Sequence, residues 1–394
     1  MTQDSYAYTR KVTLKRRLHN QWQILRHDKW LLSCLTWVPL LIWITIYAIF
    51  SQGIASNLPI GVVDLNKSYL SQKLINNYDA TSMLSVSHQY DSVAQAKDAM
   101  VSGDIYAMLV IPYDFDKSVI KSFPPQVTLF YNSQYILIGR LINSAALQAQ
   151  GTFNAQADVI KNLAKGSTTT LAAAGKAVAV RTQITPLFNK NTNYAQFLVT
   201  AIIPAIWQIG VVSFTVLILS ANYRVSGLKG WFRDQAILPH LFKTLLPYGL
   251  LFLAQGFMFL IWFYDLIGWP MEGSWTVLSI ALLITTVACM VMGCFFFFLT
   301  CDAARAMSFA GAFTAPSFAF MGITFPATNM SEVALFWREL LPISHYIEVQ
   351  VSQASYGVNA LSSLLHLLPM FVYVIPMALT LMLIQKHMSK ELDS

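Results

Sequence analysis

The segment LLSCLTWVPLLIWITIYAIF, residues 31–50, decides how this chain is organised, because it is apolar over the length that a helix needs to cross a bilayer. It stands alone in the first half of the sequence. The mostly polar segment 51–193 follows it, and the other long apolar segments lie from residue 197 onward. A chain that crosses once, forms a polar domain and then crosses again has one functional part inside the bilayer and another outside it.

The composition also predicts a membrane protein. Of the 394 residues, 55% are hydrophobic and 11% are charged, whereas an ordinary soluble domain has about 25% charged residues. Apolar runs of about 20 residues predict six spans, at 31–50, 197–219, 245–267, 275–300, 307–323 and 367–384. The fifth is short and contains Gly311 and Pro316, which favours a broken or re-entrant helix packed against protein.

The first span has an alternative interpretation as a cleavable secretory signal, because residues 53–56 are small enough to resemble a cleavage site. Trp37, Pro39 and Trp43, together with the long region before the span, favour an uncleaved anchor. We therefore expect the first span to remain part of the working protein.

The basic residues predict the orientation, because lysine and arginine gather in short cytoplasmic segments. Fourteen of them lie before the first span, after the second, between the fourth and fifth, and after the sixth, whereas the two opposite segments hold only Arg338. Both termini should therefore be cytoplasmic, with segment 51–193 outside. This placement accounts for the net charge of +7, and we expect no binding to nucleic acid.

Residues 51–193 predict an extracytoplasmic α/β domain, because strand and helix signals alternate along them. The expected strands are 58–64, 83–88, 107–111 and 126–131, and the expected helices are 68–78, 93–102, 114–121, 135–165 and 171–181. The segment shows no Ser/His/Asp arrangement, no metal-ligand spacing and no phosphate-binding glycine loop. Its single histidine, His88, is better explained as a solvated strand-end residue than as a catalyst.

Two segments on the predicted cytoplasmic side could contact a partner. Within residues 1–30, Leu14, Leu18, Trp22 and Leu25 recur at helical spacing beside basic residues, which predicts an amphipathic helix at the anionic inner leaflet. A plain topology signal is the alternative.

Loop 221–244 is the only predicted cytoplasmic loop long enough to seat a partner. It has glycines for a turn, and Trp231 and Phe232 are among its apolar anchors. The alternative is a solvated loop.

Segment 324–365 is apolar but interrupted by Pro326, Pro342 and Gly357, which predicts short helices dipping into the outer leaflet instead of a seventh span. His345 and Glu348 could bind a proton or a metal there. Interfacial hydrogen bonding is the more ordinary explanation of that pair.

The sequence shows no energy source for transport. Gln208 and Gln255 are the main polar groups within spans, and no carboxylate is placed convincingly for a proton relay. A P-loop is also missing from the sequence, since Gly175-Lys176 lacks the glycine five positions earlier and is followed by Ala177. A transporter of this kind needs a motor on another protein.

Several segments resemble one family in its order along the chain. They are LPIGVVDLNKSYLS (58–71), VAQAKDAMVSGDIYAMLVIPYDFDKSV (93–119), PPQVTLFYNSQ (124–134), RTQITPLFNKNTNYAQFLVTAIIP (181–204), GITFPATNM (322–330) and LPISHYIE (341–348). The chain is similar to ABC-2 type transporter permeases of the large-ectodomain subgroup, which exports drugs and other hydrophobic molecules. The resemblance implies an α-helical polytopic membrane protein with six transmembrane helices, like a type V ABC exporter, and an inserted α/β extracytoplasmic domain.

The resemblance also implies partners. A non-catalytic permease of this family works in the bacterial inner membrane with a separate ABC ATPase subunit that binds ATP and Mg²⁺, beside a second copy or a related permease, with membrane lipids and a possible periplasmic adaptor. This chain itself is expected to bind no cofactor and no metal. The residues expected to couple to the ATPase are Trp22, Arg26, Gly227, Lys229, Trp231, Arg233 and Asp234. The residues expected at an outer gate are Phe325, Pro326, Pro342 and His345.

A different class of function stays open. The chain could be a non-transporting membrane receptor, or a secretion or assembly factor, whose outer domain binds a ligand. A membrane enzyme is the third possibility, although no catalytic constellation is visible. Neither the transported solute nor the choice between homodimer and heterodimer can be read from the residues.

Overall fold

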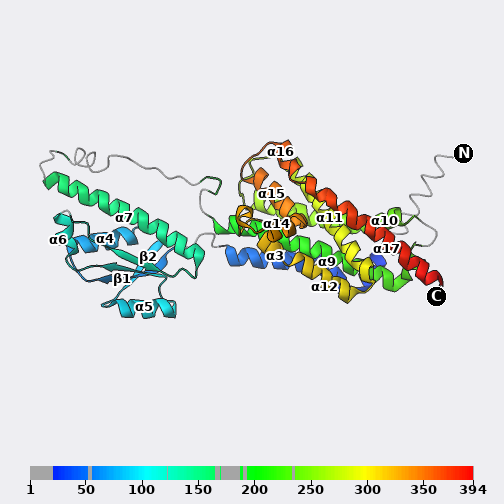
Figure 1. Cartoon of the computed structure of the whole chain (residues 1–394), viewed down its shortest axis with the longest axis horizontal. Coiled ribbons are helices and arrows are strands. Elements are labelled where there is room, and N and C mark those ends of the chain that lie inside the picture. The colour runs from blue at the N-terminus through cyan, green and yellow to red at the C-terminus, as the bar shows by residue number, and fades with distance from the viewer. Residues whose placement is uncertain are drawn as a thin grey trace. The chain divides into compact units, whose positions relative to one another are not determined.

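The computed structural model describes residues 21–51, 56–121, 123–164, 169, 187–189, 193–232 and 236–393. The chain divides into two compact units (Figure 1). The larger unit comprises Met1–Gly53 and Pro186–Ser394, and the smaller unit is Ile54–Thr185. In sequence, the smaller unit therefore interrupts the larger one after its first apolar segment.

The smaller unit is built on a four-stranded sheet in the order β2-β1-β3-β4. Strand β1 (Leu58–Asp64) pairs in parallel with β2 (Leu84–Gln89) and β3 (Ala107–Ile111), and β4 (Thr128–Tyr131) pairs antiparallel to β3. These strands confirm the four that the sequence predicts, with bounds that differ by at most two residues.

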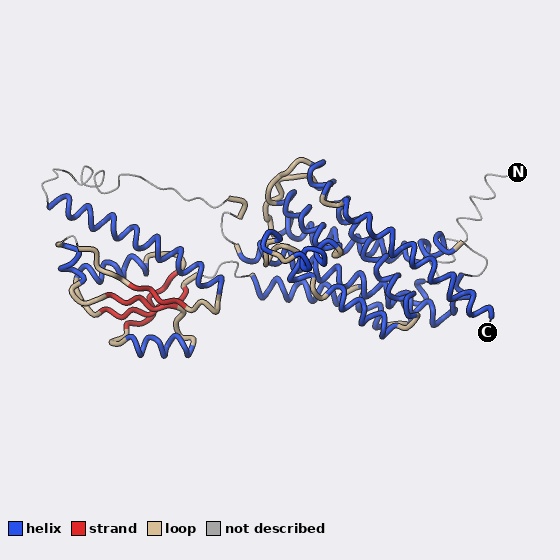
Figure 2. Tube along the Cα trace, in the orientation of Figure 1, coloured by secondary structure: helices blue, strands red, loops and turns tan. Residues whose placement is uncertain are grey.

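Helices cover both faces of this sheet, as Figure 2 shows. Helices α4 (Tyr69–Asp79), α6 (Phe115–Ile120) and α7 (Ile136–Ala164) share one core with the strands, and α5 (Val93–Ser102) shares another. Side chains of β1 alternate between the two cores, as the period of a strand requires: Ile60 and Val62 belong to the first and Val63 to the second. The helix expected at 171–181 lies outside the described residues.

In the larger unit, four helical stretches of the described chain are long and apolar enough to cross a membrane. They are Tyr194–Leu228, Ile237–Leu266, Trp275–Thr300 and Ala360–Ser389. The pair α2 (Lys29–Leu35) and α3 (Trp37–Phe50), bent by 41°, makes a fifth if the pair is one span. These stretches coincide with five of the six predicted spans.

Helix α11 (Trp275–Thr300) lies at the centre of this unit. It contacts helices from most of the rest of the unit, namely α9 (Tyr194–Phe232), α10 (Ile237–Ile261), α12 (Ala303–Thr314), α15 (Pro342–Ala354) and α17 (Val374–Asp393). Its buried side chains mix small and bulky residues, which lets neighbouring helices approach closely. A short η1 segment (Trp262–Leu266) extends α10, and α16 (Ala360–Leu365) and η3 (Leu368–Tyr373) precede α17.

The segment expected as a fifth span, 307–323, is not one continuous helix. Helix α12 ends at Thr314, and the four-residue α13 (Ser317–Phe320) follows Pro316. Proline has no N–H to continue the helical ladder, which accounts for the break. Beyond it come η2 (Ala327–Asn329), α14 (Glu332–Glu339) and α15, so segment 324–365 does form short helices as predicted.

Most of the segment expected as a loop, 221–244, is helical. Helix α9 continues to Phe232 and α10 begins at Ile237, with one non-helical residue inside α9 at Gly227 (φ 60°, ψ 174°). Glycine adopts this positive φ without steric cost. Beyond the kink at Gly227 the chain is helical again, because Leu228 and Phe232 are buried in the core of the unit, and such packing overrides the weak local preference of this glycine-containing stretch.

A buried glutamine side chain forms a hydrogen bond with the backbone carbonyl that the bend between α2 and α3 leaves open. Proline at position 39 has no N–H to donate to the carbonyl of Leu35, as a continuous helix would require. The Nε2 atom of Gln255 in α10 donates to that carbonyl at 2.8 Å instead. The bend therefore places no unpaired carbonyl at this point in the apolar interior, and it ties the first span to α10.

Replacing Gln255 with leucine should destabilise the protein by about 0.5–2 kcal/mol, because the carbonyl of Leu35 loses the donor that replaces the missing N–H of residue 39. Adding Pro39→Ala to that variant should recover part of the loss by restoring a backbone N–H. Thermal unfolding of the purified chain in detergent measures both effects. Equal stability of the wild-type chain and the Gln255→Leu variant would contradict this role.

Candidate functional site

The chain before the first span is joined to two membrane helices. Residues 21–27 are helical, and the side chain of Gln21 exchanges hydrogen bonds with Asn222 in α9 at 2.7 and 3.2 Å. The hydroxyl of Tyr248 in α10 donates to Gln21 Oε1 at 3.0 Å. An ion pair of 3.4 Å between Arg224 and Asp28 lies alongside. This set of contacts, which we call the inner junction, can pass a movement of the N-terminal helix to α9 and α10.

The structure separates the residues expected to couple to an ATPase. Trp22 is 52% exposed, and the guanidinium of Arg26 lies 5.6 Å from the centre of its ring. Trp231 is buried instead of forming a surface anchor: it stacks on Phe232, and its indole N–H donates to the hydroxyl of Thr244 at 3.4 Å. Gly227 marks the break in α9. The side chain of Lys229, and residues Arg233 and Asp234, lie outside the described part.

The residues expected at an outer gate also fall into two groups. Phe325 and Pro326 are exposed, whereas Pro342 and His345 are buried at the start of α15. His345 and Glu348, the pair considered for a proton or a metal, have different partners: His345 Nε2 lies 3.0 Å from the carbonyl oxygen of Glu339, which is the ordinary hydrogen bonding that the sequence favours. Among the described residues, no group of three or more acidic, histidine or cysteine side chains could hold a metal ion.

Glu348 belongs to a different cluster, centred on Arg338. The buried guanidinium of Arg338 pairs with Glu348 and donates to the carbonyl of Phe320, at the end of α13, at 3.0 Å. The Nδ1 atom of His366 lies 3.3 Å from the other oxygen of Glu348. A Cβ atom at Gly322, where φ is +88°, would lie 2.7 Å from Arg338 Nη1, so only glycine leaves room for this contact. We call this arrangement the outer clamp, because it holds α13, α14 and α15 together.

Gln208 makes a second buried connection to the same region. It is fully buried in α9, its Nε2 donates to the hydroxyl of Ser317 at 3.0 Å, and its Oε1 accepts the backbone N–H of Ile343 at 2.7 Å. The first N–H groups of a helix have no partner within it, and Gln208 supplies one for α15. A glutamine inside a predicted span signals a buried polar role, but the sequence alone does not reveal its partners.

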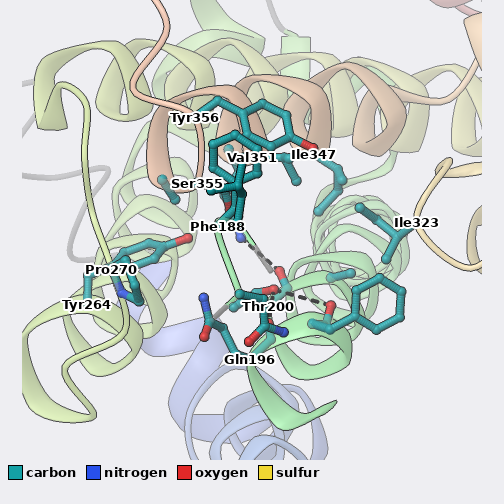
Figure 3. Close-up of a pocket in the computed structure, with 16 residues that line it drawn as sticks. Phe188, Gln196, Thr200, Tyr264, Pro270, Ile323, Ile347, Val351, Ser355 and Tyr356 are labelled. Atoms are coloured by element: carbon teal, nitrogen blue, oxygen red, sulfur yellow. Dashed lines mark hydrogen bonds between the residues drawn. The ribbon is translucent and has the colours of Figure 1, made fainter. Parts of the chain in front are cut away.

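A pocket of about 270 Å³ opens between the first turns of α9 and the last turns of α15. In Figure 3, Gln196 and Thr200 lie at one end of the pocket and Tyr356 at the other, with Tyr264 and Ile323 on opposite sides. Among the described residues, those that line the pocket are uncharged, and they mix aromatic, aliphatic and amide side chains. The arrangement suits an uncharged molecule with both apolar and polar parts.

The comparisons with known proteins agree with a transport role. A family model described as "ABC-2 family transporter protein" matches residues 29–383. The chain therefore belongs to the ABC-2 transporter family and is a multi-pass membrane subunit of a transporter. Searches of curated proteins and of solved structures gave no match.

Replacing Glu348 with glutamine should destabilise the outer clamp, because the buried charge of Arg338 loses its counter-ion. The expected cost is about 2 kcal/mol, below the usual ~3–5 kcal/mol for a broken buried pair, since Glu348 is itself partly exposed. Glu339→Gln, in the same segment but more exposed, is the matched control and should change little. Thermal unfolding in detergent compares the two, and equal melting temperatures would rule out the clamp.

Proposed function

We propose that this chain is the permease subunit of an ATP-driven exporter that moves hydrophobic or amphipathic solutes out of the cytoplasm or the inner membrane of a bacterium. The family match over residues 29–383 carries the proposal, because it includes both the membrane helices and the smaller unit. ATP and Mg²⁺ would bind to a separate ABC ATPase. The proposal includes six crossings of the membrane, of which the broken α12–α13 segment is the fifth. It also includes a periplasmic adaptor that binds the smaller unit.

The distribution of basic residues supports the orientation. Arg224 and Arg305 lie at the ends of apolar helices on the side that also holds the N-terminal helix, and Arg338 is the single basic residue of the opposite short segments. With both termini cytoplasmic, the inner junction would face the ATPase and the smaller unit would face the periplasm. The uncharged pocket would then lie near the outer ends of the spans.

The inner junction suggests how ATP binding would be transmitted. Trp22 and Arg26 expose their side chains on the N-terminal helix, where an ATPase could contact them. On the same helix, Gln21 is bonded to α9 and α10. A push on the exposed face would therefore reach the spans through partly buried side-chain hydrogen bonds.

Helix α12 supports a second permease beside this chain. Its exposed face carries the small residues Ala304, Ser308, Gly311 and Ala312 at helical spacing, beside Arg305 and Phe309, and a Cβ added at Gly311 would meet nothing within 4 Å. Small side chains let two membrane helices approach closely. This face suits another copy of the chain or a related permease.

A receptor or an assembly factor is the alternative function. The smaller unit carries a cavity of about 340 Å³ between α6 and α7, lined partly by Phe115, Phe123 and Phe153, which could receive a partner. Copurification distinguishes the two functions, because an exporter permease should bring down an ATPase with a P-loop and a receptor should not.

Purification of the tagged chain from its native host should recover an ABC ATPase, and the double variant Trp22→Ala/Arg26→Glu should reduce that recovery by about tenfold or more. Both side chains are exposed, so the variant should stay folded. Trp30→Ala, at an 81% exposed tryptophan of α2, is the matched control. If the wild-type chain recovers no ATPase, the proposed exporter function is refuted. If the double variant recovers as much ATPase as the wild-type chain, the ATPase contacts another part of the chain.

A photo-crosslinker attached to the variant Ser308→Cys should capture a second permease in membranes. The same reagent on Leu250→Cys, which is 59% exposed on α10, should not. Cys34 and Cys301 are first replaced with serine, whereas Cys289 and Cys294 are buried and can remain. Mass spectrometry identifies the product as the chain itself or a related permease. Equal products from both sites would contradict a dimer through α12.

A further inference from the structure

The smaller unit carries an open cavity with an aromatic bottom, between α6 and the C-terminal half of α7 (Figure 1). The rings of Phe115 and Phe153 line it; both are buried, and their centres lie 5.7 Å apart. Phe123 and Pro124 also line the cavity and are exposed, so they add apolar surface at its opening. The volume of about 340 Å³ lies within the usual range of small-molecule sites, about 300–1,000 Å³.

One face of α7 gives this cavity both apolar and polar groups. The residues of α7 that line it recur at the spacing of a single helical face, and they are Gln150, Phe153, Asn154, Ala157, Asp158 and Lys161. Phe153 and Ala157 are buried, whereas the side chain of Asp158 is 50% exposed and that of Lys161 is 26% exposed. Both charged side chains therefore border the cavity and are accessible to a ligand from solvent.

The two charges at this rim determine which ligand fits. Asp158 Oδ1 lies 3.7 Å from Lys161 Nζ, which is close enough for an ion pair but beyond a direct hydrogen bond of about 2.7–3.2 Å. The carboxylate can therefore accept a hydrogen bond from a ligand, and the ammonium can donate one to it. A cation beside Asp158 would be repelled by Lys161, and an anion beside Lys161 would be repelled by Asp158. A ligand that carries both charges meets an opposite charge at each of them.

We propose that this cavity binds zwitterionic molecules with a ring-sized apolar body, whose ammonium contacts Asp158 and whose carboxylate contacts Lys161. The ring packs against Phe115 and Phe153. Aromatic α-amino acids are the simplest members of this class, because a single carbon atom carries their side chain, their ammonium and their carboxylate. The inference goes beyond the exporter proposal, since the site lies within the smaller unit and its ligand needs no ATPase to bind.

Three probes that share a phenylethyl body test the charge requirement. At neutral pH phenylalanine carries both charges, phenethylamine carries only the ammonium, and 3-phenylpropanoate carries only the carboxylate. Ligand-observed NMR titration of the purified full-length chain in detergent, with protein-free micelles as the blank, gives the three dissociation constants. Phenylalanine should bind about threefold more tightly than either analogue, the effect of one more partly exposed ion pair. Equal affinities for the three probes, or no binding of phenylalanine, would overturn the proposal.

Two variants at the rim should change the order of these affinities. In Asp158→Asn an anion is no longer repelled, so 3-phenylpropanoate should bind about twofold more tightly and phenylalanine should lose its advantage over it. In Lys161→Gln phenethylamine should gain in the same way. Both side chains are partly exposed, so the variants should stay folded. Lys117→Gln, which breaks an exposed ion pair of α6 outside the lining, is the matched control and should leave the order unchanged. An order that survives in both rim variants would overturn the assignment.

A third variant shows whether the probes occupy the cavity. Phe123 is exposed, so Phe123→Ala removes apolar surface at the opening without disturbing the core. All three probes should bind about threefold more weakly while their order stays the same. Unchanged affinities would place the probes elsewhere and overturn the assignment.

Failure of this site can be distinguished from failure of the exporter proposal. The titration uses the chain without an ATPase, so a chain that recovers no ATPase from its host could still prefer phenylalanine. Conversely, a chain that recovers an ATPase but binds the three probes equally would keep the proposed exporter function and lose this site.

Discussion

A helix that breaks inside the apolar layer must find partners for its open backbone groups, because no water reaches them there. Glutamine side chains supply these partners. Gln255 and Gln350 donate to carbonyls that prolines leave open, and Gln208 and Gln353 accept backbone N–H groups at or beside the first turns of α15 and α11. Each of these bonds joins segments far apart in the sequence, so satisfying the backbone also fixes how the helices are arranged.

The same constraint explains why the outer segment has its unusual form. The short helices after Pro316 leave several helix ends inside the protein, and Arg338 pairs with one of their carbonyls and with Glu348. Irregular backbone at such depth is tolerated where it is buried in protein or lines a cavity. Here it does both, since α15 supplies the outer clamp and one wall of the uncharged pocket.

Much of the fold can be predicted from the sequence, because its signals are local. The strands of the smaller unit follow from short apolar β-branched runs between turn residues, and β1 and β3 have the expected bounds. The apolar spans follow from composition over about 20 residues. Pro316 indicated the break after α12, and Pro326 and Pro342 indicated the short helices that follow it.

The candidate site was only partly predictable, because its contacts depend on which distant residues meet. Gln208 and Gln255 were recognisable as polar groups within spans, but their partners lie 135 and 220 positions away in the chain. Trp231 was expected on a loop and is buried in a helix, and no signal in the sequence indicated that Glu348 pairs with Arg338. Residue type and periodicity therefore determined that this chain enters the membrane, and roughly where. The tertiary structure alone decided which side chain completes each broken helix, since a hydrogen bond depends on a distance in space that spacing along the chain does not determine.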